Sequence, residues 1–429
     1  MREQLLRDIE VNLNRKTIFD VRQIARALSI HSEFPQKPKI IEAILSYARG
    51  ETEAQAPSVR GAPPKSDVYD ERLVLQIEQC RQIFKSGDKQ PESVLTVNSS
   101  ERGFSGKVSG VLEKVGDSWF IMTASGEAYV ADSFLQRYPL KAGDKISGSV
   151  FRKDQSSKPA LMVIDDINGF PSENAEAGAD FSSLTPVYPE NRIILSNASD
   201  DAACRMIDVF APLAYGQRAF ITAAANCGKT TLIKTLANAI SDSGDSVVIV
   251  VLLNARPEEI TDFKRNLHGA ELFAARFDAL PSYQTRVAET AFSYARRLVE
   301  LGKSAVVLAD GLSVVGAENV KKFASYAVNA EEGGSLTVIA ALSENSEGHE
   351  GVAVTANNLI KLSPQLAARR VFPAIDAVNC FAGREESLLS SEELGAANNL
   401  RRNFGAEDIV KIFKNTCDNT RIINDYKNG

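Results

Sequence analysis

The chain has 429 residues, which is long for one domain and predicts two or three. Its 44% hydrophobic and 24% charged residues are ordinary for a soluble protein, and no run of about 18 apolar residues is present to span a membrane. The net charge of -6 argues against a surface that grips nucleic acid all over. Five scattered cysteines and an N-terminus without an apolar signal core predict a cytoplasmic protein with reduced thiols.

Residues 1–50 are predicted to form a small helical unit. Apolar residues recur at three- and four-residue spacing in "DVRQIARALSI" and "KPKIIEAILSYARG". Nine basic and six acidic residues allow either a packing module or an arm that binds nucleic acid, and charge alone favours the packing module. Residues 51–105 then have the composition of a linker with one short helix, "ERLVLQIEQCRQIF".

Residues 106–169 are predicted to form a small β-barrel. Five short alternating strands separated by turn residues suit the oligonucleotide-binding class. Trp119, Phe120 and Tyr129 could stack on bases or could fill the barrel core, and both interpretations stay open here. Eight basic residues balance eight acidic ones, so electrostatics alone does not point to RNA. Residues 170–196 have the composition of a polar connector.

Residues 197–429 are predicted to form an α/β domain. The apolar runs "RAFITAA", "SVVIVVLL", "SAVVLAD" and "SLTVIAAL" are continuous, which is typical of parallel strands buried on both faces with helices between them.

A phosphate-binding loop is predicted at "ITAAANCGKTTLIK", residues 221–234. Strand, tight turn and helix would aim backbone N–H groups at one point, with Lys229 reaching the β- and γ-phosphates of ATP and Thr230 ligating Mg²⁺. A chance Gly-Lys-Thr is common, but one placed between a buried strand and a helix is not. Ala223 stands where the usual signature has its first glycine.

A second metal-site acid is predicted at Asp310, which ends the apolar run "SAVVLAD". A carboxylate at the tip of a later strand orients Mg²⁺ in nucleotide-hydrolysing enzymes. The alternative is that Asp310 only caps the segment that follows.

Several motifs resemble those of the bacterial transcription termination factor Rho family. They are, in order, "YGQRAFITAAANCGKTTL", "VVLLNARPEEIT", "RVAETAFSYARRLVE", "NAEEGGSLTVIAAL" and "RRVFPAIDAVN". The resemblance implies a multidomain α/β protein: an N-terminal helical subdomain, an oligonucleotide-binding (OB-like) barrel, and a RecA-type P-loop ATPase core with a mainly parallel sheet. It further implies a homohexameric ring that binds single-stranded RNA, hydrolyses ATP between subunits and moves toward RNA polymerase. The family has alanine at the position of Ala223.

The resemblance also assigns roles to single positions. The loop residues Ala225, Asn226, Cys227, Gly228, Lys229, Thr230 and Thr231 bind the nucleotide. Thr230 and Asp310 hold Mg²⁺. Arg256 lies next to the γ-phosphate, Phe372 packs on the adenine, Arg370 is an interface arginine, and Arg384 is the arginine finger that acts in trans. Trp119 and Phe120 stand where the family has its aromatic RNA-binding patch.

The chain departs from the family where catalysis is concerned. The family has a glutamate that activates the attacking water, and this chain has Ala255 in "NARPEE". An alanine cannot deprotonate water, and loss of a general base costs about 10²–10⁴ in rate. Glu258 and Glu259 are retained beside the catalytic glutamate in the family, so we expect them to be structural. Asn226 and Val314 replace two basic residues.

The segments that grip RNA in the family's central hole depart as well. Only "GLSVVGAENVKKFASYAVNA" separates Asp310 from "EEGGSLT", which is too short for one of the two central loops. The other loop corresponds to "LSENSEGHEGVAVTANN", which carries Glu344, Glu347 and Glu350 and no Lys or Arg, whereas phosphate contact needs positive charge.

These observations favour a Rho-like termination factor that binds ATP and RNA, with hydrolysis and translocation weakened or lost. The alternative is a non-catalytic paralogue that acts as a nucleotide-stabilised RNA-binding regulator or scaffold. Expected partners are single-stranded RNA, further copies in a hexamer, and either RNA polymerase with its elongation factors or an active Rho; no membrane is expected. A third reading, a degenerate remnant, is disfavoured by the intact "GKTT" and "RVFPAID".

Overall fold

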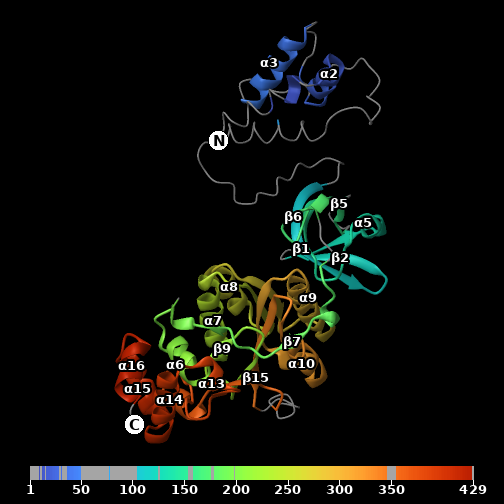
Figure 1. The fold of residues 1–429 in the computed structure, drawn as a ribbon. Helices are drawn as coiled ribbons and strands as arrows, with labels where there is room; N and C mark the ends of the chain where they lie inside the picture. The colour runs from blue at the N-terminus through green and yellow to red at the C-terminus, as the bar shows by residue number, and fades with distance from the viewer. Residues whose placement is uncertain are drawn as a thin grey trace. The chain divides into compact units, whose positions relative to one another are not determined.

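The computed structural model describes residues 9, 12–14, 16–28, 30, 36–49, 77, 104–123, 126–152, 158–174, 178–197, 199–344 and 354–427. The chain divides into two compact units, Met1–Val97 and Asn98–Gly429 (Figure 1). Most of the predicted linker over 51–105, its expected helix apart from residue 77, and Glu347 and Glu350 lie outside the described residues.

The first unit is helical in its described part. Helices α2 (Ile18–Ala27) and α3 (Lys37–Ala48) pack around a small apolar core. Pro38 lies in the first turn of α3, where its missing N–H has no intrahelical acceptor to lose. Ile40, Ile44 and Ala48 recur every four residues and are buried, which is why this helix forms against its neighbour.

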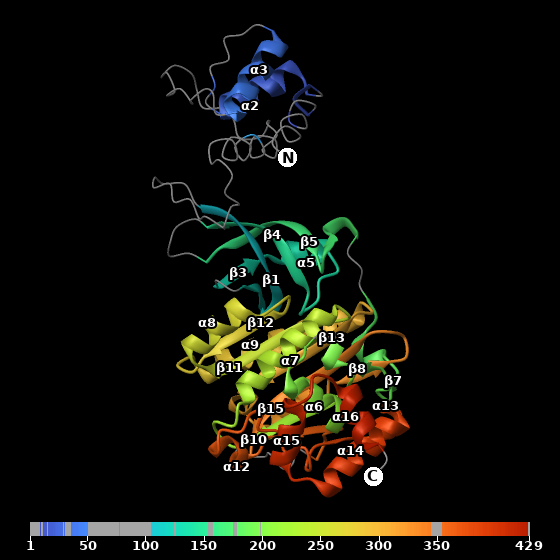
Figure 2. The same ribbon diagram turned by 90° about the vertical axis from the view of Figure 1, so that its left-hand side faces the viewer.

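The second unit begins with a six-stranded sheet, shown in Figure 2. Its strands are β1 (Phe104–Val115), β2 (Ser118–Thr123), β3 (Gly126–Val130), β4 (Lys145–Arg152), β5 (Ala160–Ile167) and β6 (Phe170–Pro171). The order is β3-β2-β1-β4-β5-β6, and a further pairing of Tyr129 with Ala160 joins β3 to β5 and closes the sheet into a barrel. Alternate residues such as Leu112, Ile121 and Ile146 fill its interior.

Two features of this region differ from the prediction. A short helix, α5 (Asp132–Arg137), follows β3 where only turn was expected. The segment 170–196, predicted to be a connector, contributes strands at both ends: β6 pairs with β5, and β7 (Pro186–Val187) pairs with β14 of the second sheet. Polar composition predicted coil there because strands two residues long leave no periodic pattern.

The second sheet forms the centre of the larger domain. Its main order is β12 (Glu271–Arg276), β11 (Val247–Ala255), β13 (Ser304–Asp310), β15 (Ser335–Ser343), β10 (Arg218–Ala223), β16 (Asn358–Lys361) and β17 (Phe381–Ala382). The first six are parallel; β17 and β14 (Val328–Ala330) are antiparallel additions, so the sheet is mixed at its margins. The four continuous apolar runs quoted above supply β10, β11, β13 and β15.

Helices cover both faces of this sheet (Figure 2). On one face α6 (Ala202–Phe210), α7 (Lys229–Ser243) and α8 (Pro257–Asn266) pack into one apolar cluster. On the other, α9 (Pro281–Glu300) and α10 (Ala317–Ala324) pack into a second, where the rings of Phe292 and Phe323 stack at 4.5 Å.

The C-terminal part of the chain is helical and joins the first of these clusters. It contains α12 (Pro364–Ala368), α13 (Glu385–Leu388), α14 (Ser391–Asn403), α15 (Ala406–Lys414) and α16 (Asn419–Tyr426). Leu400, Phe413 and Ile422 are among its fully buried residues. Within the described residues, every helix is too short or too polar to cross a bilayer.

The barrel is joined to α9 by one fully buried ion pair and by partly buried ones. Arg297 donates from Nε to Asp144 Oδ1 at 2.5 Å, and both side chains are at most 2% exposed. Asn168 donates to the same Asp144 oxygen at 2.6 Å. Near the N-terminus of α9, Arg286 pairs with two barrel residues, Glu113 at 3.2 Å and Glu127. Because a buried charge is costly without its partner, these pairs fix the barrel against the helix.

Candidate nucleotide site

The loop between β10 and α7 has the conformation that phosphate binding needs. Gly228 adopts φ 91°, a left-handed conformation that favours glycine, immediately before the first residue of α7. Asn226 also has a positive φ, 61°, which asparagine tolerates better than most residues. The first N–H groups of α7 have no acceptor within the helix because they begin it. They lie at this loop, where the oxygens of an anion could accept their hydrogen bonds.

Lys229 lies along the loop rather than in an ion pair. Its ammonium donates to the carbonyl oxygens of Ala223 at 3.1 Å and Ala224 at 2.8 Å. These are neutral acceptors, so the positive charge is held at the loop without a neutralising carboxylate in those bonds. A phosphate oxygen arriving there would exchange one of these weaker bonds for a charge-assisted one.

Thr230 and Asp310 bring two oxygen ligands together. The Thr230 hydroxyl donates to Asp310 Oδ2 at 2.5 Å, while Oδ1 accepts the N–H of Gly311 at 2.9 Å. Burial raises the pKa of Asp310, and the hydrogen bond from Thr230 opposes that rise. The alternative of a purely capping Asp310 does not account for the contact with the phosphate loop.

These residues fit ATP and Mg²⁺. Magnesium prefers hard oxygen ligands and keeps several waters, so one hydroxyl, one carboxylate and the phosphates are a sufficient set. A cation beside Asp310 would also stabilise the charged carboxylate, which burial disfavours. The chemistry of this donor set therefore agrees with the cofactors expected from the sequence.

Phe372 lies beside the phosphate loop although 144 positions separate it from Gly228. A Cβ built on Gly228 would lie 3.9 Å from the Phe372 ring. Phe372 is 37% exposed, so part of its side chain is accessible to a ligand. Arg370, two residues earlier, is exposed and has φ 60°. In the loop itself, Cys227 is buried while Ala225, Asn226 and Thr231 are exposed.

The tip of β11 carries a methyl group at the position where the sequence resemblance leads us to expect a catalytic carboxylate. Ala255 is 5% exposed and is the last residue of the strand. Arg256 and Glu258 follow it and are exposed. Glu259 accepts the backbone N–H of Arg256 at 2.9 Å, which caps the first turn of α8. Glu259 is therefore already engaged in holding the helix start.

Gln284 is a residue of this site that sequence reasoning missed. It lies on α9, is 2% exposed, and accepts the backbone N–H of Asn254 at 2.8 Å. Asn254 has φ 53° and lies in a register shift between Leu252 and Ala255, so Gln284 holds the irregular end of β11 beside Ala255. A polar residue among the apolar positions of "RVAETAF" and its flanks was the available signal, since a fully buried glutamine needs partners.

Arg384 contacts a tyrosine outside the loop. It precedes α13 with φ 58°, and its guanidinium lies 4.3 Å from the ring centroid of Tyr188. Tyr188 is 69% exposed, so this contact is at the surface. Arg384 is exposed as well, and the structure places it in contact with Tyr188 rather than with the phosphate loop.

Trp119 and Phe120 lie on opposite faces of β2. Trp119 packs against the barrel interior. Phe120 faces outward, where Tyr129 meets it edge-on at 5.8 Å and the ammonium of Lys158 lies 4.9 Å from its ring. Strand alternation thus separates the two residues that the sequence grouped as RNA-binding.

The segment that follows Asp310 is folded into the domain. Residues 311–330 form a 3₁₀ turn (Leu312–Val315), α10 and β14, and Val320, Phe323 and Ala324 are buried. Val314 packs against the same cluster. The segment is therefore part of the core. Of the acidic stretch in "LSENSEGHEGVAVTANN", the structure describes residues 342–344 and 354–358.

One protein family and one solved structure are similar to parts of this chain. Residues 203–319 match the nucleotide-binding domain of the ATP synthase alpha/beta family, which spans the phosphate loop and Asp310. A type III secretion system ATPase of pathogenic bacteria is 19% identical, with 59% of this chain and 77% of that chain covered and a TM-score of 0.45.

Two similar proteins from different bacteria are both named transcription termination factor Rho. The chain is 36% identical to transcription termination factor Rho of Mycobacterium leprae over 69% of its length, and spans only 55% of that longer protein. It is 35% identical to transcription termination factor Rho of Thermotoga maritima over 376 residues, which are 81% of this chain and 86% of that protein. The chain therefore belongs to the transcription termination factor Rho family.

Proposed function

We propose that this chain is a Rho-like termination factor that binds Mg²⁺-ATP at the loop over 223–231 and hydrolyses it slowly or not at all. The binding half is supported by Lys229, Thr230, Asp310 and Phe372, whose positions are described above. The backbone and Lys229 would hold the phosphates, the Thr230 and Asp310 oxygens would hold Mg²⁺, and Phe372 would stack on the adenine. Mg²⁺ would supply neutralisation of the phosphate charge.

The observation that carries the second half is the buried methyl group of Ala255 at the end of β11. A methyl group cannot accept a proton from water. Glu259 is engaged with the backbone of Arg256 at 2.9 Å, so its use as a base would cost the cap of α8. Bound nucleotide would then act by stabilising the assembly rather than by driving movement.

The barrel is proposed to be an oligonucleotide-binding domain for single-stranded RNA. Its closed five-strand order, with a helix between β3 and β4, suits that class. Phe120 supports stacking better than Trp119, because Phe120 faces outward beside Lys158. Assembly into a hexamer with the ATP site at a subunit boundary is proposed from the family, with Arg384 reaching the neighbour's nucleotide.

The alternative is a non-catalytic paralogue that regulates or scaffolds an active Rho. The folding of residues 311–330 into the core favours it, because that segment leaves no long loop to follow RNA through a ring. Both candidates share the nucleotide site and differ in whether phosphate is released.

The test replaces Ala255 by glutamate, with Ala255→Gln as the control of matched size. We expect phosphate release with cytidine-rich RNA to rise by about 10² or more in Ala255→Glu and to stay at the wild-type level in Ala255→Gln. Equal rates in all three proteins, with ATP bound by each, would show that Ala255 is not the missing catalytic position.

A further inference from the structure

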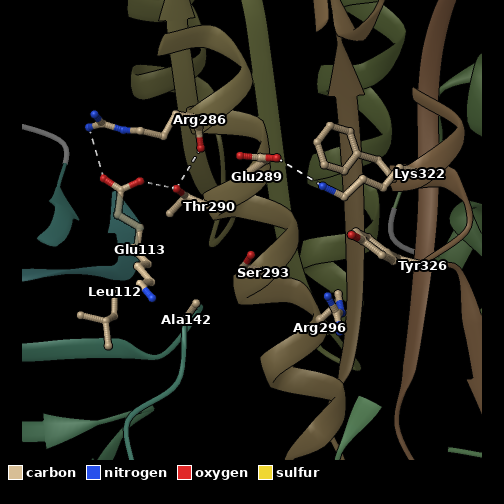
Figure 3. A pocket seen from close by; sticks show the side chains of 12 residues that line it. Leu112, Glu113, Ala142, Arg286, Glu289, Thr290, Ser293, Arg296, Lys322 and Tyr326 are labelled. Atoms are coloured by element: carbon tan, nitrogen blue, oxygen red, sulfur yellow. Dashed lines mark hydrogen bonds and ion pairs between the residues drawn. The ribbon is translucent and has the colours of Figure 1, made fainter. Parts of the chain in front are cut away.

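A cavity of about 230 Å³ lies between the barrel and the α9–α10 side of the large domain (Figure 3). Its barrel wall comes from β1 and from Ala142 in the turn before β4. Its other wall comes from α9 and α10. The phosphate-loop residues are not among those that line it, so it is separate from the nucleotide site.

The side chain of Arg296, which lines this cavity, is held between two aromatic rings. Its guanidinium lies 4.7 Å from the ring centroid of Phe181 and 4.8 Å from that of Tyr326. The two rings are themselves edge-on at 6.2 Å. A planar guanidinium held against two rings has lost much of its rotational freedom before any ligand arrives. Less entropy is then lost on binding, so the site is preorganised.

Arg296 is also uncommitted. Within the part of the chain that the structure describes, it forms no ion pair, and its buried Nε–H has no hydrogen-bond acceptor. Because Nε is enclosed, the two Nη groups are the donors that a ligand in the cavity would meet. A guanidinium without an acceptor favours an oxyanion, which matches its paired N–H groups.

The two acids that line the cavity each have a cationic partner, although Arg286 is shared between Glu113 and the barrel residue Glu127. Arg286 pairs with Glu113 at 3.2 Å, and Lys322 pairs with Glu289 at 3.2 Å (Figure 3). Burial raises the pKa of Glu113, and the hydrogen bond from Thr290 and the charge of Arg286 oppose that rise. Lys114, from β1, adds a cation that packs only loosely on Trp119, 5.9 Å from its ring. The cavity therefore has a surplus of positive charge.

We propose that this cavity binds a phosphate group, with the Nη groups of Arg296 as its principal donors and Lys114 at its rim. The phosphate could be free inorganic phosphate or a phosphodiester of an RNA chain, since both present the same oxygens. The site does not depend on the nucleotide site proposed above. A ligand there would touch both the barrel and α9 and so bridge the two domains.

The experiment uses the full chain with Lys229→Ala, which removes the competing cation of the phosphate loop. Inorganic phosphate is titrated by calorimetry into this background and into three further variants of it. Arg296→Leu removes the donors and keeps an apolar contact with the rings. Ala142→Phe fills the cavity from the barrel side and leaves Arg296 intact. Arg402→Leu, on the exposed part of α14, is the control.

We expect saturable phosphate binding in the background and in the Arg402→Leu variant, with affinity at least about tenfold weaker in the other two. If the site takes only the phosphodiester of RNA, inorganic phosphate should give no binding signal in the background or in any of the variants. Cytidine-rich RNA then binds more weakly to Arg296→Leu and Ala142→Phe, and the salt slope of Arg296→Leu falls by about one. Either pattern supports the site.

Unchanged affinity for both probes in Arg296→Leu and Ala142→Phe would overturn the proposal. A loss in Arg296→Leu without a loss in Ala142→Phe would also overturn it, because the anion would then lie outside the cavity. Thermal melting of each variant identifies misfolding; should Arg296→Leu misfold, the Ala142→Phe result decides.

Discussion

The hydroxyl of Thr230 donates a 2.5 Å hydrogen bond to Asp310, which lies 80 positions later in the chain. The bond joins the start of α7 to the carboxyl end of β13, although β15 lies between β13 and β10 in the sheet. Because both oxygens already lie side by side, Mg²⁺ binding would require the exchange of one hydrogen bond rather than movement of a strand.

Substitution Asp310→Asn should remove most of the effect of Mg²⁺ on ATP affinity. The amide keeps the shape of the side chain but loses the charge that a hard cation prefers. We expect the tightening of ATP binding by Mg²⁺ to fall about tenfold or more, measured by calorimetry with and without the metal. The control is Asp278→Asn, an exposed acid paired with Arg276. An undiminished Mg²⁺ effect in Asp310→Asn would contradict the assignment.

The pKa of Asp310 predicts a pH dependence for metal binding. Burial raises the folded-state pKa, so the carboxyl takes up its proton at a higher pH than an ordinary aspartate. Mg²⁺ affinity should therefore weaken as pH falls through that raised pKa. Metal titrations across the acidic range should show this loss, and it would occur at a lower pH if Asp310 titrated as an ordinary aspartate.

The same shift has the opposite sign for stability of the metal-free chain. A carboxyl with a raised folded pKa contributes stability below its unfolded pKa, and that contribution is lost as pH rises through the folded pKa. At neutral pH, Asp310→Asn should therefore melt no lower than the wild type without metal. A clearly lower melting temperature would show that the charged form is favourably held.

Lys229→Ala should weaken ATP binding by about 10²-fold, because it removes a charge-assisted contact to phosphate. Lys234→Ala is the matched control on the same helix; Lys234 pairs with Asp262 at 2.6 Å and faces α8. A fluorescent ATP analogue reads both affinities. Equal loss in the two variants would mean that general charge, rather than the loop, attracts the nucleotide.

Arg297→Ala should destabilise the unit Asn98–Gly429 by about 3–5 kcal/mol, since it leaves Asp144 buried without its cation. Urea denaturation measures the change. Arg402→Ala, which removes an exposed arginine, should stay within about 0.5 kcal/mol of the wild type. A loss below about 1 kcal/mol for Arg297→Ala would show that water replaces the ion pair.

The sequence was sufficient for the features that lie close together in the chain. The apolar run before "GKTT" predicts β10 and α7, and the acid after "SAVVLA" predicts the end of β13. Both depend on local patterns of burial and turn chemistry. The pairing of Thr230 with Asp310 followed because parallel strands end at one edge of a sheet.

Features set by distant contacts could not be predicted in this way. Two contacts join elements far apart in the chain: Gln284 accepts a hydrogen bond from Asn254, and Arg384 contacts Tyr188. The hydrogen bond by which Glu259 caps α8 is local, but the sequence does not show that the side chain adopts it. The opposite directions of Trp119 and Phe120 follow from strand alternation, but which face is interior depends on how the barrel closes.

The central claim is that the chain binds ATP without the carboxylate that prepares water for attack. The most direct measurement is phosphate release by the wild-type protein, at ATP concentrations shown to saturate it, with and without cytidine-rich RNA. We predict a rate that RNA leaves unchanged and that does not exceed the rate of the Lys229→Ala variant. Rapid release that RNA stimulates several-fold, and that Lys229→Ala abolishes, would contradict the account.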